Sequence, residues 1–133
     1  MPTIFDHDKL QVYQAAIQFV GWSDTTLQKV PKGFAVAGQL DRASTSIPLN
    51  IAEGNGKFTP PDRCRFFDIA RGSALECAAG LDVLVAKKQV TEPEAVEGKT
   101  ILVRIVSMLV GLIKATSTSR IYEEPGEYRT GAE

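Results

Sequence analysis

The residues best suited to chemistry lie in two stretches of polar side chains. The first stretch steps by three or four residues, which places its side chains on one face of a helix; its members are Gln39, Arg42, Ser46, Asn50 and Glu53. The second stretch places Arg71, Ser73 and Glu76 among small residues.

These polar residues allow two interpretations. In one, Arg42 binds an anion or phosphate, and Glu53 or Glu76 acts as an acid or base. In the other, the same groups form a polar network that fixes the register between helices or subunits. We favour the network, because a cation and two carboxylates on neighbouring helices usually pair with each other.

Other catalytic and metal chemistries lack the residues they need. The only histidine is His7, near the start of the chain. A di-metal site in a helical bundle uses Glu-x-x-His motifs, and a Ser-His-Asp or Cys-His centre needs a histidine base. Gly54-Asn55-Gly56-Lys57 has no preceding strand and lacks the spacing of a phosphate-binding loop. We therefore predict no catalytic residue, no metal and no cofactor.

A second candidate surface is basic and aromatic. Its residues cluster around one expected loop and the helix after it: Lys57, Phe58, Arg63 and Arg65, with Arg71 further along. Phe58 could stack on a base, whereas Asp62 and Asp68 dilute the positive charge. The net charge of −1 and the pI of about 5.9 exclude a strongly basic nucleic-acid binder but not a local patch. A homo-oligomer would repeat the patch and strengthen its field.

Helices must position these residues, because no segment has a comparable strand pattern. The 133 residues allow one domain, and apolar residues recur at helical spacing in four segments. We predict helices over about 8–25, 34–53, 62–88 and 93–116. Their short connections imply an all-α, antiparallel up-down-up-down four-helix bundle over residues 1–117. Residues 118–133 show no periodicity, and we expect a disordered tail there.

Capping signals mark the start of three of these helices. Asp6 or Asp8 is expected to cap the first helix. Thr59 is expected to cap the third, with prolines in its first turn. Thr91 is expected to cap the fourth, with Glu94 three residues further on.

The fourth predicted helix is apolar on nearly all sides. Leu102, Ile105 and Leu109 are among the residues that suffice to face a bundle core, and Val103 and Val110 then lie on other faces. Four helices cannot enclose one of their own number, so the excess apolar surface predicts a subunit interface. The alternative is packing under the C-terminal tail.

We expect a cytoplasmic protein that does not enter the membrane. No signal peptide is visible, and the most apolar segment, Ile101 to Ile113, is too short to span a bilayer. Cys64 and Cys77 lie too far apart on one helix for a disulfide, and free thiols suit a reducing compartment.

The chain resembles the four-helix-bundle family named for 23S rRNA intervening sequences, over about residues 5–115. Three blocks carry the resemblance: Gln39-Leu40-x-Arg42-Ala43-Ser44-x-Ser46-Ile47-Pro48-x-Asn50-Ile51-Ala52-Glu53-Gly54, Phe67-x-x-Ala70-Arg71-Gly72-Ser73-x-x-Glu76, and Leu10-x-Val12-Tyr13-Gln14-x-Ala16. The resemblance implies a small bacterial protein that forms a homopentameric, barrel-like ring. Members are encoded inside inserts in ribosomal RNA genes or by free-standing genes, and most have no established activity.

A related branch of similar fold comprises the accessory variability proteins of diversity-generating retroelements. Those proteins are basic and bind nucleic acid together with a reverse transcriptase, and the pI of about 5.9 sets this chain apart from them. Residues and resemblance together predict a non-enzymatic, oligomeric interaction or scaffold protein whose main partner is itself. The alternative is an RNA-binding accessory protein that works with a ribosomal RNA or a reverse transcriptase.

Overall fold

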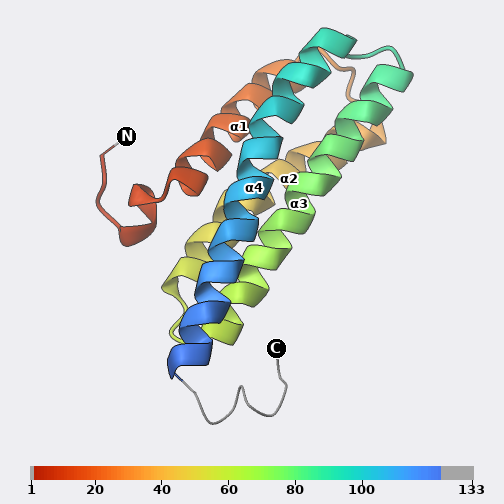
Figure 1. Ribbon diagram of the computed structural model, residues 1–133. Helices are drawn as coiled ribbons and strands as arrows, with labels where there is room; N and C mark the ends of the chain where they lie inside the picture. Colours follow the sequence, from red (N-terminus) through yellow and green to blue (C-terminus); the bar gives the residue numbers. More distant parts are fainter. Residues whose placement is uncertain (1, 124–133) are drawn as a thin grey trace.

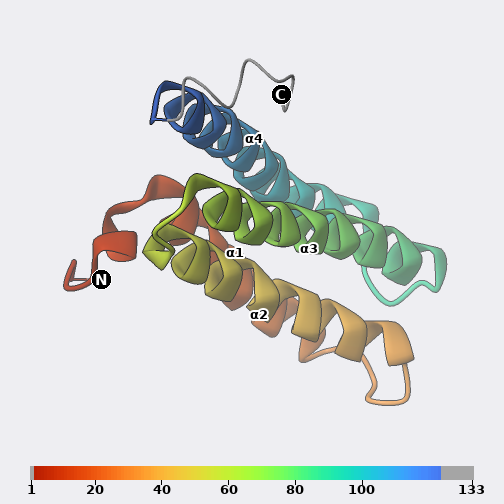
Figure 2. The ribbon, with the colours of Figure 1, turned by 90° about the horizontal axis from the view of Figure 1, so that it is seen from below.

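The computed structural model describes residues 2–123, which fold into a bundle of four helices (Figure 1). A short 3-10 turn, η1 (Asp6–Lys9), precedes α1 (Gln11–Leu27), α2 (Ala35–Gly56), α3 (Pro60–Ala86) and α4 (Glu92–Glu123). The helices alternate in direction, and α2 and α4 lie on either side of α3 (Figure 2). No described residue lies in a strand. The predicted all-α, antiparallel four-helix bundle is confirmed.

The caps expected for α3 and α4 are present. Thr59 Oγ1 accepts a hydrogen bond from the Asp62 N–H at 3.4 Å, and Pro60 opens the first turn of α3. Thr91 Oγ1 accepts from the Glu94 N–H at 3.3 Å, while Glu94 Oε1 accepts from the Thr91 N–H at 2.9 Å. Both helices therefore start close to where the sequence indicates.

The first helix begins later than predicted, at Gln11 rather than at residue 8. Leu10 is extended, with φ −75° and ψ 127°, and it separates η1 from α1. The Asp8 carboxylate accepts from the backbone N–H groups of Phe5 and Ile4, each at 3.0 Å. These two bonds lower the pKa of Asp8. Asp8 thus caps the 3-10 turn and not α1.

The fourth helix ends later than predicted, at Glu123 rather than near residue 116. The sequence explains the difference, because the strong stop signal, Pro125-Gly126, comes only after Glu123. The part of the expected disordered tail over residues 118–123 is therefore helical. Its remainder, residues 124–133, lies outside the described residues.

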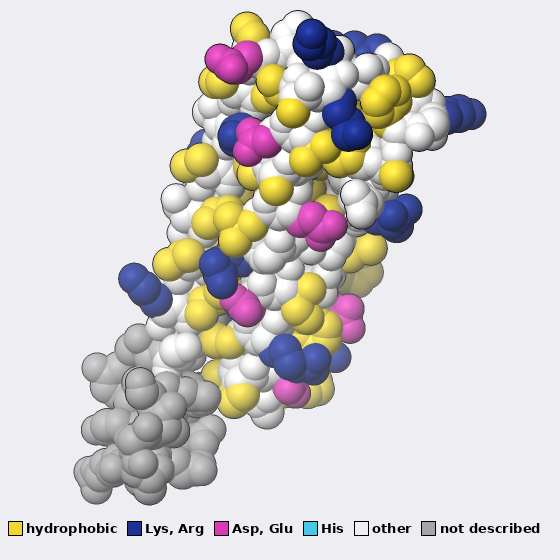
Figure 3. Space-filling model, turned by 90° about the vertical axis from the view of Figure 1, so that its right-hand side faces the viewer, with side chains coloured by type: hydrophobic (Ala, Val, Ile, Leu, Met, Phe, Trp, Pro, Cys, Tyr) yellow, Lys and Arg dark blue, Asp and Glu magenta, His cyan; other side chains and the backbone are white. Residues whose placement is uncertain are grey.

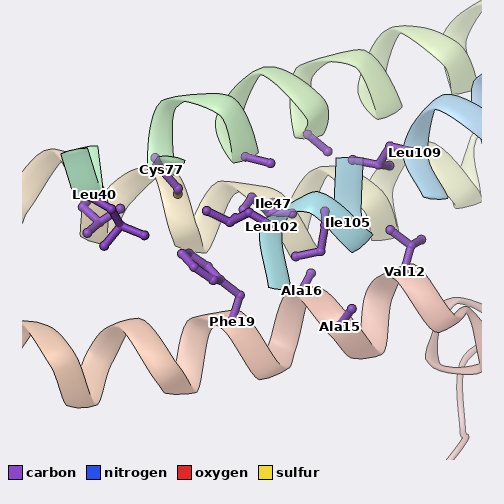
Figure 4. Close-up of a cluster of buried hydrophobic side chains, with 14 of the residues drawn as sticks. Val12, Ala15, Ala16, Phe19, Leu40, Ile47, Cys77, Leu102, Ile105 and Leu109 are labelled. Carbon is purple, nitrogen blue, oxygen red and sulfur yellow. The ribbon is translucent and has the colours of Figure 1, made fainter. Parts of the chain in front are cut away.

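Large apolar side chains from all four helices form the core (Figure 4). Fully buried members include Phe19, Leu40, Ile47, Phe67, Ile105 and Leu109. Cys77 lies among them as a free thiol, and its burial, assisted by the negative charge of Glu76, raises its pKa to about 12. Cys64 is also free.

The Trp22 side chain links α1 to α4. The Trp22 indole stacks on Phe19 with ring centroids 5.6 Å apart, and its Nε1–H donates to Glu97 Oε1 at 2.6 Å. Lys29 and Glu94 form an ion pair between the α1–α2 connection and α4.

Among the described helices, none combines the length and apolarity that crossing a bilayer requires.

Candidate functional site

The polar stretches of α2 and α3 meet at a hydrogen-bonded serine pair. Ser46 Oγ and Ser73 Oγ are 2.9 Å apart, and Asn50 Nδ2 donates to Ser46 Oγ at 2.9 Å and to the Ser46 carbonyl at 2.8 Å. All three side chains are half-buried. The structure thus brings together three of the eight predicted residues in a small network that fixes the register of α2 against α3.

The charged members of the two stretches do not pair across the helices, which corrects our expectation. Arg71 pairs with Asp68 one turn earlier on α3, at 3.0 Å, and Glu53 Oε2 lies 3.9 Å from Nζ of Lys57, the residue that follows α2. The remaining members, Gln39, Arg42 and Glu76, are exposed. Among the described residues, none of these three has a hydrogen-bond or ion-pair partner. The reason is geometric, because the serines occupy the contact between α2 and α3, and the longer charged side chains project outward.

A hollow of about 440 Å³ lies on the outer face of α2, beside the serine pair. It is lined by Asp41, Arg42, Thr45, Ser46, Leu49, Asn50 and Glu53. Its hydroxyls are engaged, since Thr45 donates to the Asp41 carbonyl at 3.0 Å and Ser46 bonds to Ser73. The Arg42 guanidinium is the group in the hollow that is available to bind an anion.

The single histidine lies away from this hollow. His7 stacks on Phe5 and meets the edge of Tyr13 at a centroid distance of 4.7 Å. Within the described part of the chain, no three His, Cys, Asp or Glu side chains group so that they could hold a metal ion.

Part of the predicted basic and aromatic surface has a structural role. Arg63 Nη1 donates to the carbonyls of Asn55 at 2.9 Å and Lys57 at 3.4 Å, so it caps the end of α2. Lys57 Nζ and Arg65 Cζ lie over the Phe66 ring, 5.0 and 4.6 Å from its centroid. Sequence reasoning missed Phe66, because a ring shared by two cations is visible only when the loop is folded.

Phe58 follows Lys57 in the loop between α2 and α3, and 98% of its surface is exposed. It is therefore the free aromatic ring of the predicted basic surface. Arg71, the outlying member, is occupied by Asp68.

Large apolar side chains are exposed on three of the four helices. They are Leu49 on α2, Ile69, Leu75 and Val83 on α3, and Val96 and Val103 on α4. No large apolar side chain of α1 is exposed. Figure 3 shows the side of the molecule on which α3 lies, with hydrophobic side chains scattered between charged ones. Sequence reasoning anticipated surplus apolar residues on α4, and Val103 is 64% exposed.

The architecture defines the class of the protein as an antiparallel four-helix bundle. The family model of the 23S rRNA-intervening sequence protein matches residues 8–111. The chain therefore belongs to the 23S rRNA-intervening sequence protein family.

A solved structure supports the fold. It is the crystal structure of a protein of unknown function from the S23 ribosomal protein family of Bacteroides thetaiotaomicron, with a TM-score of 0.73. The two chains are 23% identical, and the match covers 77% of this chain and 98% of the other. At this identity the likeness establishes the fold alone. A comparison with curated proteins gives no match.

Proposed function

We propose that this protein is a non-enzymatic homo-oligomer that acts as an interaction or scaffold module in the cytoplasm. The observation that carries the proposal is the set of exposed apolar side chains on α2, α3 and α4, of which Leu49 and Val103 are more than 60% exposed. A ring of five copies, which the resemblance to the family implies, is part of the proposal.

Burial of these side chains supplies the driving force. Full burial of one exposed Val, Leu or Ile contributes about 1.5–3 kcal/mol. Part of this gain offsets the lost freedom of the associating copies.

The test is the mass of the protein in solution at micromolar concentration, measured by native mass spectrometry or light scattering. We expect an oligomer, and we expect Val103→Asp to lower its mass while the helical circular dichroism remains. Gln18→Asp, at an exposed position of α1, is the matched control and should leave the mass unchanged. A wild-type monomer would refute the proposal.

A second candidate function, binding of single-stranded RNA, is favoured by the position of Phe58. This almost fully exposed ring follows Lys57 in the chain, and Lys57 and Arg65 both lie over the nearby Phe66 ring. An exposed ring at the same end of α3 as these cations is suited to stacking a base while the cations attract the phosphates. Binding should weaken steeply as salt increases. Phe58→Ala should reduce it, whereas Val83→Ala, at an apolar side chain that is 39% exposed near the opposite end of α3, should not. Absence of binding to an unstructured RNA at low salt would exclude this function.

A further inference from the structure

Two charges of opposite sign lie unpaired on the outer side of the α2–α3 contact. Arg42 is one turn before Ser46 on α2, and Glu76 is almost one turn after Ser73 on α3. Because the two helices are antiparallel and joined at the serine pair, both residues lie at the same height on the bundle. Both side chains are exposed, and neither has a partner among the described residues.

The surface around these charges is open and partly apolar. Leu49 is 62% exposed and Ile69 is 43% exposed. Gly72 lies in the middle of α3, and a Cβ built there would meet no atom within 4 Å. A glycine inside a helix costs about 0.5–1 kcal/mol relative to alanine. Packing within one chain does not require a glycine at position 72. The exposed backbone there leaves room for another molecule to approach closely.

We infer that a second copy of this chain binds the α2–α3 face and that Arg42 of one copy pairs with Glu76 of its neighbour. The inference rests on the proposed homo-oligomer and adds where the copies meet. The face carries both a free cation and a free carboxylate, so an identical molecule supplies the missing partner of each. A partner of uniform charge would satisfy only one of them. The pairing of Arg42 with Glu76 fixes the register of the contact between the two copies.

Charge reversal tests this pairing. Arg42→Glu and Glu76→Arg each place like charges opposite one another, and each should raise the dissociation constant of the oligomer about tenfold or more. The double variant, Arg42→Glu with Glu76→Arg, restores an attractive pair and should recover most of the wild-type mass. Arg104→Glu is the control, because Arg104 is an exposed cation of α4 without a partner in the described part of the chain. Circular dichroism verifies that every variant is folded.

The outcomes separate this inference from the proposed function. A wild-type oligomer whose mass survives both single reversals would overturn the inference and leave the homo-oligomer standing. Dissociation of both single variants without recovery in the double variant would overturn the pairing. A wild-type monomer would refute the proposed function itself. The Arg42–Glu76 contact is supported only if both single variants dissociate and the double variant recovers the wild-type mass.

Discussion

At the scale of single residues, Gly98 is the glycine with the least room for a side chain. A Cβ at this position would lie 2.4 Å from Trp22 Cη2 and 2.9 Å from Leu81 Cδ1. The indole cannot simply move aside, because its Nε1–H is bonded to Glu97. The missing side chain of Gly98 is therefore what allows α4 to approach α1 and α3.

We expect Gly98→Ala to destabilise the fold by about 1–3 kcal/mol, the range typical of overpacking a core. Gly111→Ala is the matched control on the same helix, since a Cβ there would meet nothing within 4 Å. Its better helix propensity should stabilise the fold by up to about 1 kcal/mol. Urea unfolding of both variants measures the two effects, and equal midpoints would contradict the packing described for Trp22.

The two cysteines should differ in reactivity. Cys77 is fully buried and its pKa is raised to about 12, whereas Cys64 is half-buried. Because the thiolate is the reactive form, we expect iodoacetamide at pH 8 to modify Cys64 first and Cys77 only when the chain unfolds. Mass spectrometry of tryptic peptides distinguishes the two sites, with Cys64→Ser as the control.

The raised pKa of Cys77 also makes the stability of the fold depend on pH. The pKa is higher in the folded chain than the ordinary value of 9.0, so the unfolded thiol loses its proton first. The contribution of the buried Cys77 side chain to the free energy of unfolding is therefore intact below pH 9, and it diminishes as the pH rises from 9 towards 12.

Part of the residue-level site could be predicted from the sequence. Steps of three and four residues place Ser46 and Asn50 on one face of α2, and that face does meet Ser73. The lack of a partner for Arg42 could not be predicted. Periodicity gives the face of one helix, but pairing depends on the rotation and distance of the next helix.

At the scale of elements, short polar motifs decide where the helices begin. Thr59 and Thr91 cap α3 and α4 as their sequences indicate. The start of α1 was predicted wrongly because Asp8 bonds to N–H groups that precede it and stabilises a separate 3-10 turn. A carboxylate near the expected start of a helix can close either turn, and the sequence does not choose between them.

Thr91→Ala should remove one side of the reciprocal cap of α4 and cost about 1 kcal/mol. The control is Thr100→Ala on the same helix, where the hydroxyl only bonds back to the Val96 carbonyl. Alanine there should be neutral or slightly stabilising. Thermal unfolding compares the two variants. A larger loss for Thr100→Ala would show that the cap contributes little.

At the scale of the whole molecule, α3 is central and α1 is peripheral. α3 packs extensively on both α2 and α4, while the contacts of α1 with its two neighbours are fewer. The bundle and its helix order could be predicted from hydrophobic periodicity. The distribution of exposed apolar side chains over α2, α3 and α4 could not, because it depends on how each helix is rotated in the bundle.

This asymmetry predicts the order of local opening. Amide hydrogen exchange should be fastest in α1 and slowest in the middle of α3, since opening follows the number of buried contacts that must break. Exchange measured by mass spectrometry on peptides from each helix tests the order. Uniform protection across the four helices would indicate that α1 opens only with the whole fold.

The contact of Trp22 with Glu97 also has a spectroscopic consequence. The chain contains a single tryptophan, and it lies where α1 meets α4, stacked on Phe19. Its fluorescence therefore reports the docking of one helix and not an average over the molecule. If α1 detaches first, the emission will shift to longer wavelength before the helical circular dichroism is lost, and the native chain will reveal this step without any attached dye.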